Sequence, residues 1–427
     1  MSISTPIQAQ PGTRRSLWRN VVIFLAVMGP GIITANVDND AGGITTYSLA
    51  GSQYGNKLLW TLIPITIALV VVQEMCARMG VVTGKGLADL IREQFGVKVT
   101  FWVMVALLVA DVGNTVAEFS GVAASVSIFG VPAWISVPVT ALAVWVLVVK
   151  GTYRQVEKVF LVACVFYVAY PISSFLAHPD WHTVLKATVT PSFEMDGGYV
   201  AMLIGVVGTT IAPWMQFYLQ SAVVEKGVKV DHYPHSRFDV IVGCIITDVV
   251  AFFIIAACAA TIFKVGVKVE TADQAAQALA PLAGRYASWL FAFGLFNASF
   301  FAASILPLAT SYYICEAFGW ESGIDRKWGE AKHFYTLYTG IVVVGAAVVL
   351  VPHLPLLKIM LISQIVNGVL LPFILIFMLI LVNRPRIMGR HVNGPWFNGV
   401  AWVTTVVMIA LTAYLVASGA RDLLRAG

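Results

Sequence analysis

Charged residues are scarce in this sequence, and that scarcity excludes most classes of soluble protein. Asp, Glu, Lys and Arg together make up 11% of the 427 residues, whereas a soluble globular domain has about 25%. Hydrophobic residues make up 59%, and apolar runs of about 18 residues or more, each long enough to cross a bilayer as a helix, recur along the chain. The composition therefore predicts an all-α polytopic membrane protein, with no room for a separate soluble domain.

Features of catalytic and thiol chemistry are also missing. There is no H-E-x-x-H, no G-x-S-x-G and no phosphate-binding loop, so the sequence indicates neither an enzyme nor a bound cofactor. The five cysteines form no C-x-x-C pair, which argues against a disulfide or a thiolate metal site. All seven histidines fall in expected loops or at the ends of apolar runs. None of them is therefore placed to relay a proton at mid-membrane.

Eleven membrane spans are expected from the apolar runs and from the Gly, Pro and charged residues that bound them. The first, third and eighth exceed the length that a straight span needs, so they are candidates for tilted or broken helices. The spans cover residues 20–54, 57–79, 99–129, 131–149, 156–177, 198–224, 238–264, 283–318, 335–352, 356–383 and 397–419.

The basic residues predict the orientation of these spans. Nineteen of the 27 lysines and arginines fall in alternate segments outside or at the ends of the spans, with at least three in each. By the positive-inside rule these segments face the cytoplasm, so we expect a cytoplasmic N-terminus and an external C-terminus in the plasma (inner) membrane of the cell. The net charge of +5 then reflects topology and gives no reason to expect nucleic acid. The basic segments are 14–19, 78–98, 150–158, 226–237, 326–332 and 384–390.

Two apolar runs are interrupted at corresponding places by residues that disfavour a helix. The first interruption reads Asn36-Val37-Asp38-Asn39-Asp40-Ala41-Gly42-Gly43, and the second reads Gly208-Thr209-Thr210-Ile211-Ala212-Pro213-Trp214. An acid at mid-bilayer costs about 2.5–3.5 kcal/mol, so the two aspartates need a reason. One reading is a glycine kink whose acids face a vestibule. We favour an unwound segment whose carbonyls and carboxylates meet a cation, as in transporters with broken helices.

A polar stripe lies on the third expected span. Asp111, Asn114 and Glu118 follow an i, i+3, i+7 spacing, which places all three on one face of a helix. The stripe either lines an ion path or forms a buried hydrogen-bonded network. Of the two acids, Glu118 is the stronger candidate for the ion path.

Two further acids lie within expected spans. Asp248 is alone in its span, where we favour a structural hydrogen bond over a role in transport. Glu74 lies four residues before Arg78, and this spacing predicts an ion pair at a helix end.

The sequence resembles the NRAMP family of divalent-metal transporters over nearly its whole length. The resemblance implies a LeuT-like fold, in which two inverted repeats of five helices precede one extra helix and helices 1 and 6 are broken. Residues 1–427 then form a single transmembrane domain, with repeat one at about 20–177, repeat two at about 198–383 and the extra helix at about 397–419. The segments that carry the resemblance are Gly29-Pro30-Gly31, Asp40-Ala41-Gly42-Gly43, Tyr54-Gly55-Asn56-Lys57-Leu58-Leu59-Trp60, Ala212-Pro213, Ser221-Ala222, Ser363-Gln364-Ile365-Val366 and Leu371-Pro372-Phe373.

Departures from the family pattern point to one branch of it. The family's first broken helix reads Asp-Pro-Gly-Asn, so its asparagine ligand becomes Gly43 in this chain. Its sixth helix reads Met-Pro-His, so the thioether ligand becomes Ala212 and the histidine becomes Trp214. The arginines that usually begin the ninth helix are missing around Phe334-Tyr335-Thr336-Leu337-Tyr338. This combination resembles the NRAMP-related magnesium transporters.

The resemblance implies a site for a hydrated ion. A thioether favours soft transition metals, and its loss removes that preference, while Mg²⁺ is hard and keeps several of its waters. Asp40 would supply the main charge, Gly43 and Ala212 would leave space for water, and Glu118 would bind the water shell. The remaining metal ligands would be Val37, Thr209 and Gln364, and the cavity would be lined by Asp111, Asn114, Trp214 and Gln216.

The leading expectation is uptake of hydrated Mg²⁺, and of Mn²⁺ as well, by alternating access with weak or absent proton coupling. One alternative is a proton-coupled importer of Mn²⁺ or Fe²⁺ in which Asp40, Asp111 or Glu118 carries the proton. Another is an ion-coupled transporter of a small organic solute, although Asp38 and Asp40 disfavour amino acids. The expected partners are the transported metal ion and the lipid bilayer, with no obligate protein partner.

Overall fold

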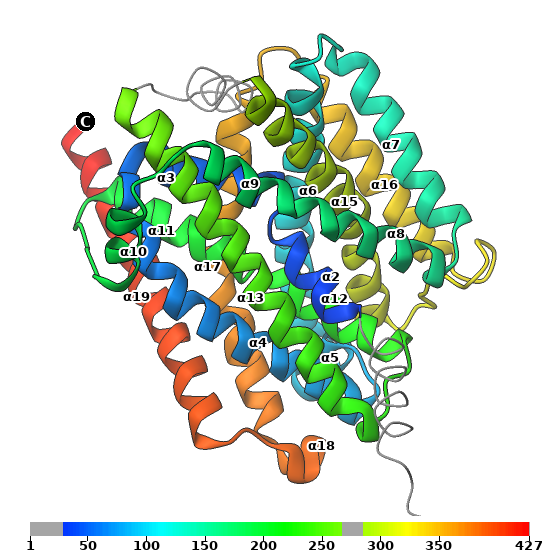
Figure 1. Ribbon diagram of the computed structural model, residues 1–427. Helices are drawn as coiled ribbons and strands as arrows, with labels where there is room; N and C mark the ends of the chain where they lie inside the picture. Colours follow the sequence, from blue (N-terminus) through cyan, green and yellow to red (C-terminus); the bar gives the residue numbers. More distant parts are fainter. Residues whose placement is uncertain (1–28, 267–284, 427) are drawn as a thin grey trace, which may run out of the picture.

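The computed structural model describes residues 29–266 and 285–426, and the regular elements within these ranges are all helices (Figure 1). In chain order they are α2 (Pro30–Val37), α3 (Ala41–Tyr54), η1 (Gly55–Thr61), α4 (Leu62–Thr83), α5 (Leu87–Phe95), α6 (Val97–Ser127), α7 (Ala133–Lys150), α8 (Tyr153–Val165), η2 (Phe166–Val168), α9 (Ala169–Leu176), α10 (Trp181–Val189), α11 (Gly197–Thr210), α12 (Pro213–Glu225), η3 (Val230–His232), α13 (Tyr233–Cys258), η4 (Ala259–Phe263), α15 (Arg285–Phe318), α16 (Lys332–Val349), α17 (Leu356–Val382), α18 (Pro385–Met388), η5 (Gly389–His391) and α19 (Pro395–Ala426).

Ten helices in the described ranges are long and apolar enough to cross a membrane. The difference from the expected eleven arises near the start of the chain, because the stretch Ala41–Thr83 counts once although it holds the end of the first predicted span and all of the second. Gly55, inside that stretch, has φ +59° and ψ −131°, which is not helical, so the backbone changes direction there. Residues 20–28 and 283–284 of two predicted spans lie outside the described residues.

Three short helices, α5, α10 and α18, lie in segments that the sequence reading treats as loops. In α5 the apolar residues Leu87, Leu90 and Ile91 are buried, whereas Glu93 is exposed. Their i, i+3, i+4 spacing is itself a helix signal. A search for long apolar runs misses such amphipathic helices because they lie at the ends of the bundle instead of spanning it.

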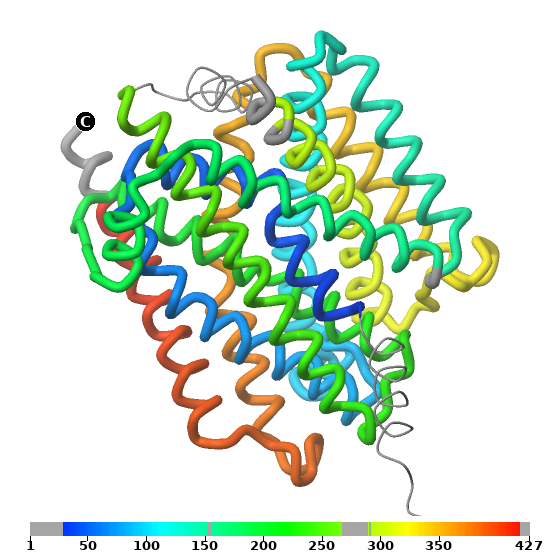
Figure 2. The backbone as a smooth tube through the Cα atoms, in the orientation of Figure 1, coloured from blue at the N-terminus to red at the C-terminus, as the bar shows by residue number. Residues whose placement is uncertain are grey.

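The two interrupted segments lie in the interior of the bundle. α2 packs beside α13, α11 packs on α17, and α6 and α15 pack against each other (Figure 1). α19 lies at one edge of the molecule against α17, α11 and α4, and α7 and α16 lie together at the opposite edge. In the tube view of Figure 2 the blue chain of α2 runs through the middle of the molecule. Other helices therefore surround the irregular backbone, which a membrane tolerates only where protein or water satisfies it.

α11 and α17 approach each other closely at two glycines. A Cβ atom at Gly208 would lie 2.2 Å from the carbonyl oxygen of Gln364, and one at Gly368 would lie 2.4 Å from the carbonyl oxygen of Ile204. Small residues at a helix crossing are a common way for membrane helices to approach. This contact places Gln364 of α17 next to the C-terminal end of α11, where Thr209 lies.

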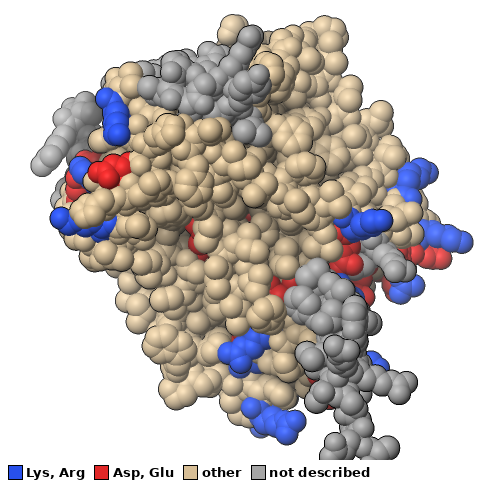
Figure 3. All heavy atoms as spheres, viewed as in Figure 1, with Lys and Arg blue, Asp and Glu red and all other residues tan. Residues whose placement is uncertain are grey.

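Charged side chains gather toward the ends of the bundle. Figure 3 shows Lys and Arg near the lower and right edges and at the upper left, with a wide band of mostly uncharged surface between them. Large apolar side chains are exposed on the outer helices, for example Trp102, Val139 and Phe373. A hydrophobic band between charged ends is the surface that a membrane-spanning protein requires.

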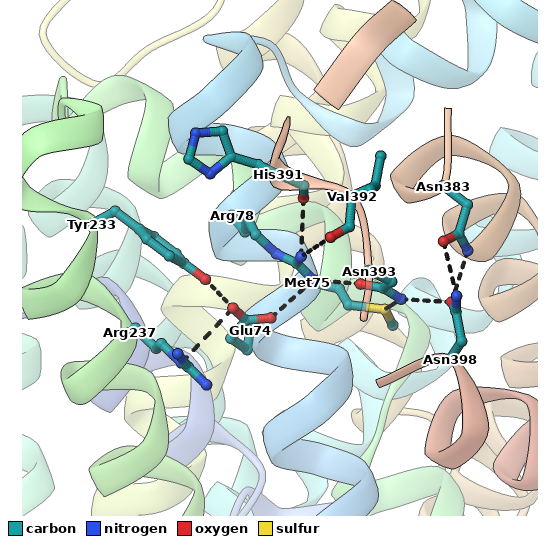
Figure 4. A network of polar contacts seen from close by, with 10 residues as sticks. All are labelled: Glu74, Met75, Arg78, Tyr233, Arg237, Asn383, His391, Val392, Asn393 and Asn398. Carbon is teal, nitrogen blue, oxygen red and sulfur yellow. Dashed lines mark hydrogen bonds and ion pairs between the residues drawn. The ribbon is translucent and has the colours of Figure 1, made fainter. Parts of the chain in front are cut away.

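The predicted ion pair between Glu74 and Arg78 is confirmed. An Arg78 Nη2 atom lies 3.1 Å from Glu74 Oε2, and Arg78 Nη1 donates to two carbonyl oxygens in the connection before α19, at 3.0 and 3.1 Å. Figure 4 shows the pair between Tyr233 and Arg237 of α13 on one side and Asn393 on the other. The pair therefore joins three segments of the bundle and is more than a local helix-end contact.

Replacing Arg78 by methionine is expected to destabilise the protein by about 3 kcal/mol, because it leaves the nearly buried Glu74 carboxylate with weaker partners. The measurement is the thermal unfolding midpoint of the full chain in detergent. Arg386→Met is the matched control, since Arg386 is exposed and lies on the short helix α18. Equal midpoints for the two variants would contradict a structural role for the Glu74–Arg78 pair.

Candidate cation site at the two helix breaks

The first predicted break is confirmed between α2 and α3. α2 ends at Val37, and Asp40 is extended, with φ −69° and ψ −178°. The Asp40 carboxylate accepts a hydrogen bond from the backbone N–H of Gly43 at 2.5 Å, so it caps the N-terminus of α3. Val37 is the last residue of α2, where helix carbonyls lack intrahelical partners and carry partial negative charge. Both features favour a cation at this point.

The second predicted break is confirmed between α11 and α12. Ile211 and Ala212 leave the helical conformation, with φ −122°, ψ 53° and φ −63°, ψ 138°, respectively. Pro213 starts α12, where its missing N–H costs nothing, and the residue before a proline prefers an extended backbone. The sequence thus determines both the end of α11 and the start of α12 locally.

Glu118 of α6 lies directly against the first break. Its Oε2 atom accepts a hydrogen bond from the backbone N–H of Ala41 at 3.0 Å, so Glu118 and Asp40 both act on the first turn of α3. Both side chains are buried, at 0% and 4% exposure. The Glu118 and Asp40 carboxyl groups are close enough to share a proton; apart from this contact the second Glu118 oxygen, Oε1, has no hydrogen-bond partner, and a buried carboxylate oxygen without a partner is costly.

Thr209 of α11 closes the site from the other side. Its Oγ1 atom lies 3.0 Å from the position that a Cβ atom of Gly43 would take, and this hydroxyl is buried without a hydrogen-bond partner. Thr209 and Gly43, which the sequence reading placed in one site, are therefore neighbours. The two buried oxygens, Thr209 Oγ1 and Glu118 Oε1, belong to residues that border the two ends of the Asp40–Gly43 segment.

The expectation that Gly43 leaves room for water is not met in this conformation. A Cβ atom at Gly43 would lie 2.1 Å from the carbonyl oxygen of Asp38, so the glycine admits the unwound backbone instead of opening a space. Restoring an asparagine at this position would push on the Asp38 carbonyl. A substitution at Ala212 therefore tests the ligand set with less disturbance than one at Gly43.

Gln364 of α17 contacts the first turn of α3. Its Nε2 atom lies 1.9 Å from the position of a Cβ atom at Gly42, and that same position is 3.3 Å from Asp40 Oδ1. The Gln364 amide therefore lies beside the Asp40 carboxylate, as a ligand carried by α17 would. The amide reaches this place only because residue 42 has no side chain.

A chain of hydrogen bonds leads away from Gln364 to the polar stripe of α6. Asn367 donates to Gln364 Oε1 at 3.1 Å and to Asn114 Oδ1 at 3.1 Å, and Asn114 donates to Asp111 Oδ1 at 3.1 Å. The Asp111 carboxylate also accepts from Tyr313 at 2.9 Å and from a threonine hydroxyl of α15 at 3.0 Å. Of the two readings left open for the stripe, the structure shows the buried network for Asp111 and Asn114.

Asn367 and Tyr313 belong to this network but were not predicted from the sequence. Asn367 lies three residues after Gln364, so the i, i+3 spacing could have found it once Gln364 was suspected. Tyr313 has no comparable signal, because it lies on α15 and meets Asp111 only through tertiary packing.

The remaining candidates lie at the start of α12. Trp214 is buried, and its ring is 6.3 Å from that of Tyr218. Gln216 donates to the Ala212 carbonyl at 3.1 Å and accepts a contact from the Cys76 thiol at 3.4 Å. The Gln216 amide thus has partners on α4 and at the break, and these contacts do not place it beside Asp40. Ala212 offers only a methyl group at the break.

The groups at the two helix breaks that could bind a metal ion all offer oxygen atoms. No group of three or more His, Cys, Asp or Glu side chains within residues 29–266 and 285–426 could hold a metal ion. A cation at the breaks would depend on Asp40 and Glu118, together with the Thr209 hydroxyl, the Gln364 amide and the Val37 carbonyl. Carboxylate, hydroxyl, amide and carbonyl oxygens are the ligands of hard cations.

Gly42→Ala is expected to lower cation transport about tenfold, equivalent to ~1.4 kcal/mol, because a methyl group would displace the Gln364 amide from Asp40. The fold should survive, since only the end of a flexible side chain must move. Uptake by proteoliposomes and the unfolding midpoint are the measurements. Gly113→Ala on α6 is the control, since its nearest neighbour would be Ser363 Cβ at 3.8 Å. Unchanged uptake in Gly42→Ala would remove Gln364 from the site.

Comparison with known proteins identifies the family. A family model described as "Natural resistance-associated macrophage protein-like" (Nramp) matches residues 31–418. The chain belongs to the Nramp family. It is 28% identical over 407 residues to the divalent metal cation transporter MntH of Bacillus subtilis (strain 168), with 92% of each chain covered. It is 27% identical over 412 residues to the MntH of Deinococcus radiodurans, covering 93% of this chain and 91% of that protein.

Solved structures show the fold of this Nramp protein. A crystal structure of the Eremococcus coleocola manganese transporter, in complex with an aromatic bis-isothiourea substituted compound, is similar with a TM-score of 0.73 and 23% identity, covering 96% of this chain and 88% of that one. Mhp1, a nucleobase-cation-symport-1 family transporter, is similar with a TM-score of 0.57 and 13% identity, covering 92% and 93%. The predicted LeuT-like fold with two broken helices is thus confirmed.

Proposed function

We propose that this Nramp protein is a divalent-metal transporter whose main cargo is hydrated Mg²⁺, with Mn²⁺ as a second cargo. Its relatives in Bacillus subtilis and Deinococcus radiodurans are named divalent metal cation transporters, which supports the general class. The chemistry of the helix breaks supports the choice of a hard ion. Within the described residues, the donor set assembled above around Asp40 contains no thioether and no imidazole.

The observation that carries the proposal is the pair of buried oxygens beside Asp40. Thr209 Oγ1 is buried without a hydrogen-bond partner, and Glu118 Oε1 has none other than the neighbouring Asp40 carboxyl group. The water shell of a hydrated ion held by Asp40 would donate hydrogen bonds to both oxygens. Mg²⁺ gives up its waters reluctantly and usually keeps several of them when it is bound.

Weak or absent proton coupling is part of the proposal. The seven histidines lie at helix ends or in connections, so none supplies a titrating group at mid-membrane. α16 begins with Lys332 and His333, and the segment from Phe334 to Tyr338 holds no arginine. A co-transported proton would have to bind a carboxylate that also binds the metal ion or belongs to the Asp111 network.

The repeat division and the orientation belong to the same proposal. Repeat one (about 20–177) and repeat two (about 198–383) each contain one broken helix near their start, as inverted repeats require. The positive-inside pattern supports a cytoplasmic N-terminus and an external C-terminus in the plasma membrane. Alternating access would then proceed around the paired breaks.

Competition in proteoliposomes tests the cargo. Mn²⁺ entry is followed with a metal-quenched dye while Mg²⁺ or Ca²⁺ is added outside. We expect Mg²⁺ to suppress Mn²⁺ entry in a concentration-dependent way, because both ions use the Asp40 site. If Mn²⁺ enters and a large excess of Mg²⁺ has no effect, the proposal of a magnesium transporter is wrong and a transition-metal importer remains.

A further inference from the structure

Asp38 and Asp248 are two buried acids at the contact between α13 and the unwound segment that follows α2. α13 runs alongside α2 in register: a Cβ at Gly243 would lie 3.1 Å from Ala35 Cβ. One turn further, Asn39 Nδ2 donates to Thr247 Oγ1 at 2.7 Å. Asp248 follows Thr247, and Asp38 precedes Asn39, so both aspartates lie at this contact between α13 and the unwound segment.

Neither carboxylate has an ion-pair partner among the described residues. Apart from a contact between Asp248 and the Thr66 hydroxyl, both oxygens of Asp38 and both oxygens of Asp248 are buried and unpartnered, and the two residues are only 1% and 5% exposed. No Lys, Arg or His in the described parts of the chain forms an ion pair with either one. A hydrogen bond from the Thr66 hydroxyl fits the structural role that the sequence favoured for Asp248, and it still leaves both carboxylates without a counter-charge. Two ionised carboxylates in an apolar interior are expensive unless they take up protons or a counter-charge lies beside them.

The nearby hydroxyl groups are neutral, so they cannot supply the counter-charge. The Thr66 hydroxyl, which faces Asp248, donates to the Leu62 carbonyl at 2.7 Å. The Thr247 hydroxyl donates to the carbonyl of Ala35. Each hydroxyl has a single proton, for which a backbone carbonyl competes, and each hydroxyl oxygen keeps lone pairs that a cation could use.

The donor groups of Tyr47 and Asn39 are likewise directed to other partners. The Thr210 hydroxyl donates to the Val206 carbonyl at 2.8 Å, so the Tyr47 hydroxyl, 2.7 Å away, must donate to Thr210 and not to an aspartate. Asn39 uses its NH₂ group on Thr247 and keeps an unpartnered Oδ1, and Asn39 is 0% exposed. The surroundings of the two aspartates are thus rich in acceptors and poor in donors.

We propose that Asp38 and Asp248 form a second cation site, distinct from Asp40, that takes a hard, oxygen-preferring cation. The four carboxylate oxygens, the Asn39 amide oxygen and the Thr66 hydroxyl oxygen are ligands of the type that Na⁺ and Mg²⁺ prefer. The site joins α2 and the unwound segment to α13. A cation bound there holds the first break in the conformation that presents Asp40.

Cation-dependent stability of the full chain in detergent tests this second site without relying on transport. The unfolding midpoint is measured in choline chloride, and again with NaCl or MgCl₂ replacing part of the choline at equal ionic strength. All measurements are made in the Asp40→Ala background, which removes the main charge of the first site. We expect the midpoint to rise by about 3 °C or more in at least one of the two salts, because a ligand that binds only the folded state stabilises it.

Charge removal at the second site gives the decisive comparison. Adding Asp248→Asn to Asp40→Ala is expected to abolish the cation response and to raise the midpoint in choline chloride, since an unpaired buried charge is lost. Asp231→Asn, at an exposed position, should leave both values unchanged. A response to Na⁺ alone identifies a sodium site, and a response to Mg²⁺ alone identifies a divalent site. A response that survives Asp248→Asn, or no response to either cation in Asp40→Ala, overturns the proposal.

Discussion

Asp40→Ala is expected to reduce Mg²⁺ and Mn²⁺ uptake to the background of protein-free liposomes. Asp40 is the carboxylate of the unwound segment that lies between Glu118, Gln364 and the N-terminus of α3. Loss of a charged contact of this kind costs up to about 3 kcal/mol, which corresponds to about 100-fold in affinity. Uptake of each ion is measured in proteoliposomes, beside Asp231→Ala, whose position is exposed.

Asp40→Asn separates the charge of Asp40 from its structural role. Asparagine caps a helix as well as aspartate does, so the hydrogen bond to the Gly43 N–H and the start of α3 should persist. We expect the Asp40→Asn protein to have a normal unfolding midpoint and no uptake. Transport at the wild-type rate by this variant would show that Asp40 does not hold the cargo.

Ala212→Met is expected to change which ion is bound. Ala212 is 2% exposed and lies at the break before Pro213, so a methionine there would bring a thioether toward the oxygen ligands. A soft ligand should raise the affinity for Cd²⁺ and Mn²⁺ by about tenfold, or ~1.4 kcal/mol, and the added volume should lower Mg²⁺ uptake by displacing water from the ion.

Calorimetric titration with Cd²⁺ and Mg²⁺, together with uptake of both ions, measures this change. Ala143→Met on α7 is the matched control, because Ala143 is exposed on the outer surface of the bundle. The methionine is introduced without Gly43→Asn, since the Asp38 carbonyl fills the space beside Gly43. Equal Cd²⁺ affinities in the Ala212→Met and wild-type proteins would show that residue 212 does not face the ion.

The breaks and the polar stripe could be predicted from the sequence because their causes are local. Pro213 fixes the start of α12 through its own geometry, and Asp40 caps α3 through a hydrogen bond three residues along the chain. The i, i+3, i+7 spacing placed Asp111 and Glu118 on one face, although it could not say that the first would join a network and the second would cap α3.

The contacts that complete the site could not be predicted because they join distant parts of the chain. Gln364 meets Gly42 only because α11 and α17 approach each other at Gly208 and Gly368. Likewise, Asp248 lies beside the unwound segment only because α13 packs along α2. Periodicity reports the face of one helix, while these features depend on how several helices pack.

The measurement that tests the account most directly is Mg²⁺ entry into proteoliposomes with simultaneous recording of internal pH. We predict that Mg²⁺ accumulates down its gradient, that Asp40→Asn abolishes this entry, and that the internal pH changes little during it. Entry of Mn²⁺ with acidification of the lumen, and no entry of Mg²⁺ under the same conditions, would contradict the proposal of a hydrated-magnesium transporter.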